Sequence, residues 1–405
     1  MKFTKYLKRK VLKKEFKKKL QYSKTLGTDG ITVNKFQSIL DDEIDIIKRK
    51  VKNSTYRFSR YKEKLILKGK DKLPRVIQIP THRDKLLLNA LNSFIKDKFK
   101  DKVFDSSNIH RRITDIKNQL TTSKYDSFIK IDIENFYPTI NHDILLDKVS
   151  EVVDDEKALY ILQKAIENDT GIAQGLSVSN ILASIYMLKF DEKYLNLENI
   201  SYYRYVDDIL ILCNSSDIEV IKQSLKEDIE KLDLKMHPFG ANKEKSAVGL
   251  IEIEQLQYLG FEFFNQDISI RDTTIEKFQQ RIIDLFKEHK KLENKDFYEK
   301  LNLKITGCVY NNKQYGWLYF FSMLNDLTLT YKLDHFVKKC CKQFGRKYDE
   351  NKIKTFHKTY YKLKSLDTSK LNDKSYIPKF TKTNKNVIGF NLDLIESYSL
   401  DIDYY

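Results

Sequence analysis

The chain has 405 residues and a mass of 48.1 kDa, which predicts about two or three structural units. Its hydrophobic fraction of 41% is enough for a core, and its 12 glycines and 5 prolines exclude collagen-like and linker-like sequences. The 73 basic residues exceed the 57 acidic ones by 16, which favours a polyanionic partner, nucleic acid before membrane. No apolar stretch approaches about 18 residues, so no membrane span is expected.

The N-terminal segment, residues 1–24, is rich in lysine and predicts a basic amphipathic helix. Its apolar residues recur at near-helical spacing. They are Phe3, Leu7, Val11, Leu12, Phe16 and Leu20. A solvated surface helix and a helix that contacts nucleic acid both fit this pattern. The segment lacks the apolar stretch of a secretory signal, and the four cysteines form no CxxC pair, so we expect reduced thiols in a cytoplasmic protein.

The next part of the chain predicts a turn-rich entry, a helix that ends near residue 50, a β-hairpin over 56–80 and helices over 81–120. The hairpin segment alternates apolar and charged residues around a polar centre that contains glycine. Its tip should therefore be basic.

Two apolar segments further along carry aspartates. SFIKIDIE, residues 127–134, predicts a strand with Asp132 near its end, and YYRYVDDILILC, residues 202–213, predicts two strands around Asp207 and Asp208. The remaining elements are a helix capped by Asn141, helices over 176–197 and 216–235, a hairpin over 256–271, a helical region from 274 to about 366 and a mixed tail over 367–405.

These aspartates are unusual because a carboxylate buried in an apolar sheet costs several kcal/mol unless a cation compensates it. Taken alone, Asp132 could be a strand-end or capping residue, and the Asp207–Asp208 pair could be a solvated β-turn. Together they could converge and hold two divalent metal ions about 3.5–4 Å apart, the arrangement that in-line phosphoryl transfer uses.

Seven segments, in order over residues 24–340, resemble motifs of reverse transcriptases. They are GTDGITVNKF (27–36), LPRVIQIPTHRDKLLLNAL (73–91), IKIDIENFYPTI (129–140), AQGLSVSN (173–180), YVDD (205–208), YLGF (258–261) and YGWLYFF (315–321). The chain resembles the bacterial group II intron and retron-like enzymes, and FYPTI with QGLSVSN is most similar to the defence-associated or abortive-infection members. Three features depart from those relatives: Asn180 stands where they usually have proline, the retron Asn-Ala-x-x-His feature is missing, and no zinc-type endonuclease motif follows.

The resemblance implies an α+β right-hand polymerase whose palm is an antiparallel sheet backed by helices. Its parts would be a basic N-terminal helix (1–24), fingers (25–125), a palm (126–265, with part of the fingers near 160–180), a helical thumb (266–366) and a C-terminal extension (367–405).

The resemblance also implies the site residues. Asp132, Asp207 and Asp208 would be catalytic and, with the carbonyl of Ile133, would bind two Mg²⁺ ions, for which Mn²⁺ could substitute. The nucleotide-binding residues would be Arg75, Lys70, Tyr137, Gln174, Gly175 and Lys245. The template- and primer-binding residues would be Ser179, Tyr258, Leu259 and Gly260.

Three of these roles carry a physical reason. The ring of Tyr137 would exclude a 2′-hydroxyl and so select deoxynucleotides, with a core aromatic as the alternative. Arg75 would clamp the triphosphate together with Lys68, Lys70 or Lys72. Lys245, in competition with Lys243, would donate a proton to pyrophosphate.

The expected function is an RNA-directed DNA polymerase in bacterial antiphage defence, using an RNA template, a DNA or RNA primer and deoxynucleotides. A non-coding RNA, a second defence protein and oligomerisation are further possible partners. Two alternatives stay open. One is template-independent or protein-primed synthesis, for which the 25 tyrosines, including Tyr398, Tyr404 and Tyr405, offer hydroxyls. The other is a non-catalytic, maturase-like RNA-binding protein.

Overall fold

The structure is a computed structural model, which divides into two compact units. The first comprises Met1–Ser107 and Ile129–Val248, and the second Asn108–Phe128 and Gly249–Tyr405. The described residues are 2–67, 74–100, 102–103, 109–167, 170–240, 245–264, 267–290, 292–310, 313–365 and 376–380. In this part of the chain no helix is long and apolar enough to cross a membrane.

The N-terminal segment of the first unit is helical, but it is not one continuous α-helix. A 3₁₀ turn (Phe3–Lys5) is followed by α1 (Arg9–Glu15) and a π-helical turn (Phe16–Leu20). Its apolar face is buried in the main core, which fits the predicted amphipathic pattern. On its polar face, Arg9 forms ion pairs with Asp41 and Asp45 of the neighbouring helix α3 (Leu40–Lys52).

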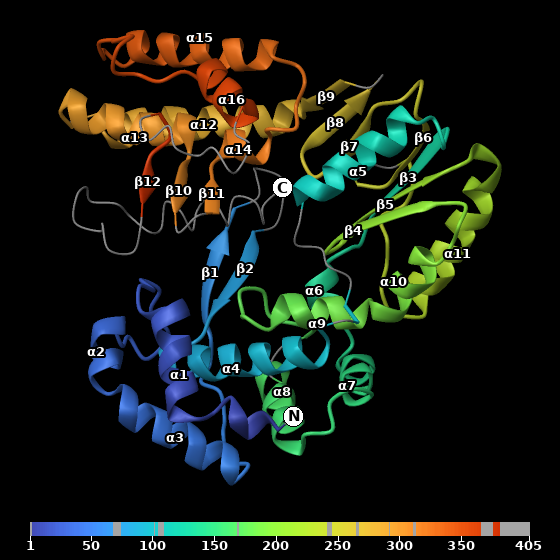
Figure 1. Cartoon of the computed structure of the whole chain (residues 1–405). Helices are drawn as coiled ribbons and strands as arrows, with labels where there is room; N and C mark the ends of the chain where they lie inside the picture. Colours follow the sequence, from blue (N-terminus) through green and yellow to red (C-terminus); the bar gives the residue numbers. More distant parts are fainter. Residues whose placement is uncertain are drawn as a thin grey trace. The chain divides into compact units, whose positions relative to one another are not determined.

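Helices and one β-hairpin lie around the N-terminal segment in the first unit (Figure 1). They are α2 (Val33–Ser38), α3 (Leu40–Lys52), β1 (Lys62–Ile66), β2 (Arg75–Ile79), α4 (His82–Lys98) and α8 (Glu156–Ile166). Strands β1 and β2 pair antiparallel, which confirms the described strands of the predicted hairpin, whereas its tip lies outside the described residues. The hydroxyl of Thr81 accepts a hydrogen bond from the N–H of Asp84 and so caps α4.

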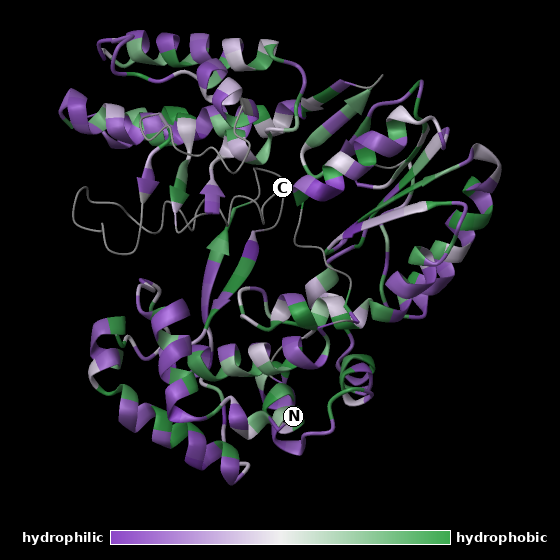
Figure 2. Ribbon diagram, in the orientation of Figure 1, coloured by the Kyte–Doolittle hydropathy of each residue, from purple (hydrophilic) through white to green (hydrophobic). Residues whose placement is uncertain are grey.

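A four-stranded sheet carries the predicted aspartates. Its strands are β3 (Ser127–Asp132), β4 (Ser201–Tyr205), β5 (Asp208–Cys213) and β6 (Ala247–Leu250), in the order β4-β5-β3-β6. Strands β3 and β5 are almost wholly buried, because they are the two inner strands of the sheet. After Asp208, β5 is apolar (Figure 2), whereas β3 also contains Ser127, Lys130 and Asp132. The pair β4–β5 is antiparallel, and helices cover the sheet, so the α+β expectation is confirmed.

The helices after β3 follow the sequence pattern with one difference. They are α6 (Phe136–Thr139), α7 (His142–Ser150), α9 (Ser179–Tyr186), α10 (Leu188–Leu195) and α11 (Ile218–Glu230). Asn141 caps α7 as predicted, since its side-chain oxygen accepts hydrogen bonds from two backbone N–H groups. The prediction of a single helix over 176–197 is wrong. The segment becomes helical only at Ser179, and a break at Met187 divides it into α9 and α10.

The second unit corrects two expectations. The segment predicted as a hairpin over 256–271 is a three-stranded meander, β7 (Leu256–Tyr258), β8 (Phe261–Phe264) and β9 (Asp267–Ile270). The region from 274 onward is not wholly helical, because a small sheet β11-β10-β12 interrupts it. The elements are α5 (Ile109–Thr121), α12 (Asp272–Glu288), α13 (Asn294–Thr306), β10 (Cys308–Tyr310), β11 (Lys313–Tyr315), α14 (Trp317–Phe320), α15 (Thr328–Gln343), α16 (Phe356–Ser365) and β12 (Lys379–Phe380).

Two glycines explain why the small sheet forms inside a helical region. Gly307 has φ +62°, and a Cβ built there would lie 2.0 Å from the carbonyl oxygen of Tyr315. Gly316 has φ +144° and lies against the backbone of Gly307. Only residues without a side chain allow α13 to end this abruptly and the backbone to turn into β10.

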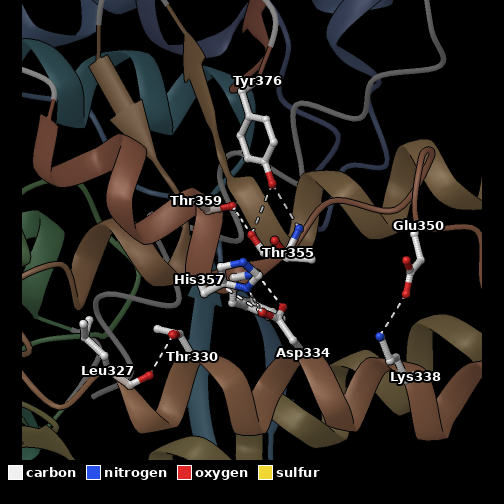
Figure 3. A network of polar contacts seen from close by, with 10 residues as sticks. Leu327, Thr330, Asp334, Lys338, Glu350, Thr355, His357, Thr359 and Tyr376 are labelled. Carbon is white, nitrogen blue, oxygen red and sulfur yellow. Dashed lines mark hydrogen bonds and ion pairs between the residues drawn. The ribbon is translucent and has the colours of Figure 1, made fainter.

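A polar network joins α15 to the start of α16 (Figure 3). The carboxylate of Asp334 accepts hydrogen bonds from the backbone N–H groups of Phe356 and His357, at 2.6 and 3.3 Å. One of its oxygens also lies 2.6 Å from the Nδ1 atom of His357. Asp334 therefore stabilises the start of α16 although it belongs to another helix. All four cysteines, three of them in this unit, are buried, and none forms a disulfide.

Candidate active site

The sheet brings the three predicted carboxylates to the same end of its two inner strands. Asp132 is the last residue of β3, and the next strand in the sheet, β5, begins at Asp208. The N–H of Ile133 donates to the carbonyl of Asp207 at 3.1 Å, so the end of β3 is tied directly to the turn before β5. Segments more than 70 residues apart in sequence thus place their acidic side chains together.

The turn that carries Asp207 is strained. Tyr205 pairs with Asp208, which leaves Val206 and Asp207 as a two-residue turn. Val206 has φ +57°, a region that a β-branched residue enters only at a cost of order 1–3 kcal/mol. Strain of this kind persists only where surrounding contacts hold the backbone, and it is concentrated at functional sites.

A buried ion pair supplies one such contact. Arg204 and Asp191 are each 1% exposed, and the guanidinium binds the carboxylate through two nitrogens, with Nε at 2.7 Å from Oδ1. The hydroxyl of Tyr202 donates to the same carboxylate at 2.6 Å. Arg204 also donates through Nη1 to the carbonyl of Val206 at 2.9 Å. The strained turn is therefore fastened to helix α10, which contains Asp191.

The carboxyl groups at the turn are held in a different environment. Asp207 and Asp208 keep part of their surface exposed, yet protein atoms surround their carboxyl groups. This desolvation raises the pKa of Asp207, and the charge of Asp132 raises it further. Burial raises the pKa of Asp208 to about 7, opposed by the charge of Lys130 and reinforced by Asp207. The site thus concentrates negative charge that it does not fully neutralise.

A lysine and a histidine lie on the Asp132 side of the cluster. The Nζ of Lys245 donates to Oδ2 of Asp132 at 2.5 Å, and Nε2 of His237 lies 3.2 Å from the same oxygen. The other ring nitrogen of His237 lies 3.4 Å from Glu134. The backbone is fixed as well, since the N–H of His237 donates to the carbonyl of Asp132 at 3.0 Å.

The donor chemistry suits hard divalent cations. Carboxylate and carbonyl oxygens are the ligands that Mg²⁺ prefers, and a cation would lower the cost of the charge held on Asp207 and Asp208. Within the described residues, no three acidic, histidine or cysteine side chains already form a closed ligand cluster. The metal roles of these residues and of the Ile133 carbonyl stay predictions.

The loop before α9 lies against strand β2. The carbonyl of Gln174 accepts a hydrogen bond from the N–H of Gln78 at 2.7 Å. Gly175 has φ +101°, and a Cβ there would lie 2.8 Å from the carbonyl oxygen of Gln78, so this close approach requires glycine. The same strand carries Arg75, whose positive charge partly opposes the rise that burial causes in the pKa of Asp207. The predicted nucleotide-binding residues on these two segments therefore belong to the same neighbourhood as the aspartates.

Tyr137 and Ser179 lie beside this loop. The hydroxyl of Tyr137 donates to Oδ1 of Asn180 at 2.8 Å. The hydroxyl of Ser179 is buried and donates to the carbonyl of Ala173 at 2.6 Å, so here it anchors the loop. Its predicted template contact is untested.

The remaining predicted residues are not among the described residues of the first unit. Lys70, with Lys68, Lys72, Lys243 and the tail tyrosines, lies outside the described residues. Tyr258, Leu259 and Gly260 belong to the second unit, where all three are buried. Leu259 and Gly260 both have positive φ and form the tight turn between β7 and β8, a conformation that matches the twist of a hairpin.

Sequence reasoning missed four residues of this site. Lys130 and Arg204 carried a usable signal, because each is a charged residue inside an apolar strand next to an aspartate. His237 had none, since only the folded chain brings it to Asp132. Asn180 stood out only as a departure from the usual proline, and the fold alone shows that it binds Tyr137.

Comparison with known proteins agrees with this geometry. Residues 66–263 match the family described as reverse transcriptase (RNA-dependent DNA polymerase). The group II intron-encoded protein LtrA of Lactococcus lactis subsp. cremoris, including that of strain MG1363, is 23% identical over 197 residues. The match covers 44% of this chain and 33% of LtrA, so the chain spans about a third of the length of these relatives.

Solved telomerase structures are also similar. The structure from Candida albicans in complex with a fragment of telomeric RNA is 15% identical, with a TM-score of 0.45, over 82% of this chain and 62% of that one. Apo telomerase from Candida tropicalis is 16% identical, with a TM-score of 0.46, over 76% and 62%. The antiparallel sheet and the family match are in accord with a right-hand polymerase fold. Residues 66–263 of this chain are a reverse transcriptase domain.

Proposed function

We propose that this protein is an RNA-directed DNA polymerase that adds deoxynucleotides to a 3′-hydroxyl by two-metal phosphoryl transfer. The observation that carries the proposal is the joining of the Asp132 strand end to the Asp207–Asp208 turn inside a reverse transcriptase domain. The raised pKa values of Asp207 and Asp208 support it, because they mark carboxylates whose charge calls for a cation.

In this proposal Asp132, Asp207 and Asp208 hold the ions, with help from the Ile133 carbonyl. When bound, the ions supply positive charge that lowers the pKa of the primer hydroxyl and offsets the charge on the leaving pyrophosphate. Lys245 is close enough to Asp132 to keep a proton near that position, which suits a donor to pyrophosphate. Arg75 and the backbone at Gln174 and Gly175 would bind and orient the nucleotide.

The proposal includes the division of the chain into fingers, palm and thumb over 25–125, 126–265 and 266–366. It also includes an RNA template, a primer and a cytoplasmic location. We further propose a role in antiphage defence, supported by the similarity of FYPTI and QGLSVSN to defence-associated enzymes. Loss of phage protection in the Asp207→Asn, Asp208→Asn variant, measured by plaque counts, would be expected if that role holds.

The direct test is primer extension by the purified full chain. An RNA template with a DNA primer, deoxynucleotides and Mg²⁺ should give a product, and the Asp207→Asn, Asp208→Asn variant should give none. Asp147→Asn, an exposed carboxylate on α7, is the matched control and should keep wild-type activity. Product from the double variant, or RNA binding without synthesis on any template, would overturn the proposal. Product of unchanged yield without template would favour template-independent synthesis.

A further inference from the structure

We propose that Asn180 is a specificity-determining residue that holds the ring of Tyr137 in place and so strengthens selection of deoxynucleotides. This inference rests on the proposed function. It concerns the residue at which the chain departs from the proline of the enzymes it resembles, and it starts from the hydrogen bond of 2.8 Å between the Tyr137 hydroxyl and Oδ1 of Asn180.

Tyr137 is fixed first through its backbone. Its carbonyl accepts a hydrogen bond from the N–H of Ile172 at 2.8 Å. Gly171, with φ +72°, lies so close that a Cβ there would be 2.2 Å from the Tyr137 carbonyl oxygen and 2.4 Å from the carbonyl carbon of Pro138. This packing fixes the backbone from which the side chain of Tyr137 projects. The two side-chain torsions, χ1 and χ2, still allow the ring to rotate.

The bond to Asn180 fixes the far end of the ring. Asn180 lies in the first turn of α9, and its neighbour Ser179 anchors that turn by donating to the carbonyl of Ala173 at 2.6 Å. The acceptor therefore has a stable support. A ring restrained at both ends makes a stiffer wall than a ring restrained at one end, and proline at 180 could not supply this acceptor.

A stiff wall matters because selection against ribonucleotides depends on a clash. A 2′-hydroxyl adds one oxygen, and a ring that can swing away gives this oxygen room. Losing a neutral hydrogen bond should therefore lower discrimination by roughly 2- to 10-fold. Incorporation of deoxynucleotides should change less, because they do not press on the ring.

The test uses the purified full chain and measures kcat/KM for a deoxynucleotide and for the matching ribonucleotide. Asn180→Leu keeps the size but removes the acceptor, whereas Asn180→Asp keeps an acceptor. Tyr137→Phe keeps the ring but removes the donor. We expect Asn180→Leu and Tyr137→Phe each to lower the discrimination ratio roughly 2- to 10-fold, and Asn180→Asp to retain it. Asp147→Asn, the exposed carboxylate on α7, is again the control and should change nothing.

The double variant Asn180→Leu, Tyr137→Phe decides whether the two residues act through one bond. A ratio no lower than that of either single variant supports the inference, whereas additive losses overturn it. An unchanged ratio in Asn180→Leu, with deoxynucleotide synthesis intact, overturns the inference and leaves the proposed function standing. A wild-type chain that incorporates neither nucleotide overturns the proposed function and this inference with it. Thermal unfolding of each variant separates loss of the gate from loss of the fold.

Discussion

Arg204 joins Asp191 to the carbonyl of Val206, in the turn that also carries Asp207, and the two carboxylates lie in opposite electrostatic environments. The carboxylate of Asp191 is enclosed and accepts hydrogen bonds from Arg204 and Tyr202. Burial by itself lowers the pKa of Arg204, but the hydrogen bonds and charge of Asp191 outweigh this, so the net shift is upward. At Asp207 burial raises the pKa and the carboxylate of Asp132 raises it further, against the opposing charges of Lys245 and Arg75.

The difference separates a structural charge from a functional one. A buried charge with a bidentate partner contributes to a defined conformation, and removing one partner is costly. Carboxylates that repel one another destabilise the fold and persist where binding a cation offsets their cost. Here the buried pair of Arg204 with Asp191 holds the turn that carries the repelling carboxylates, through the hydrogen bond from Arg204 to the carbonyl of Val206.

The largest expected effect separates activity from stability. Asp207→Asn should lower polymerase activity by about 10³-fold or more, since it removes a proposed metal ligand worth several kcal/mol in the transition state. The same change should leave the free energy of unfolding equal or higher, because it removes a desolvated charge. Primer extension and chemical denaturation measure the two quantities. A variant that loses both together would show that Asp207 is structural.

For the buried pair of Arg204 and Asp191, the large effect is expected on stability. Arg204→Met or Asp191→Asn should lower the free energy of unfolding by about 3–5 kcal/mol, because each leaves an uncompensated or unsatisfied group at a site that is 1% exposed. The double variant Asp191→Leu, Arg204→Met should recover part of that loss. Urea denaturation of the single and double variants checks this. Single losses below about 1 kcal/mol would mean that the pair contributes little.

The pH dependence of stability tests the charge at the turn. The pKa of Asp208 is raised from 3.8 to about 7 in the folded chain. The folded chain therefore keeps a proton that the unfolded chain releases, so stability attributable to Asp208 should be full below about pH 4 and fall as the pH rises to about 7. The size should be on the order of a few kcal/mol.

The measurement is the free energy of unfolding of the wild type and of Asp208→Asn at several pH values. A chelator is present so that no metal ion binds. The difference between the two isolates Asp208 from other titrating groups, and the variant should gain stability relative to wild type towards pH 7. A difference that stays constant across the range would contradict the raised pKa. Adding Mg²⁺ at neutral pH should stabilise the wild type more than the variant.

The smallest effect is expected in the second unit. Asp334 and His357 are 12% and 26% exposed, so their pair is less desolvated than Asp191 with Arg204. Asp334→Ala should cost about 1 kcal/mol, mostly through the lost N–H bonds at the start of α16 (Figure 3). Thermal unfolding measures it, with Glu350→Ala on the exposed ion pair with Lys338 as the control, which should change little. A loss as large as that of Arg204→Met would contradict this ranking.

The sequence by itself determined the sheet strands and their acidic ends. Alternating or continuous apolar runs predicted β3, β4 and β5, and acidic residues inside such runs indicated Asp132, Asp207 and Asp208 as a candidate site. These signals are local, so composition and spacing within a few residues suffice to reveal them. The cap of α7 by Asn141 is predictable for the same reason.

Tertiary structure alone decided which distant residues serve those acids. The bond between Tyr137 and Asn180 and the approach of His237 and Lys245 to Asp132 join segments from 43 to 113 residues apart. The breaks at Met187 and between Gly307 and Gly316 depend on packing in the same way. Local sequence patterns do not predict these long-range contacts, because the free energy that favours the contacts arises only when the strands and helices have packed.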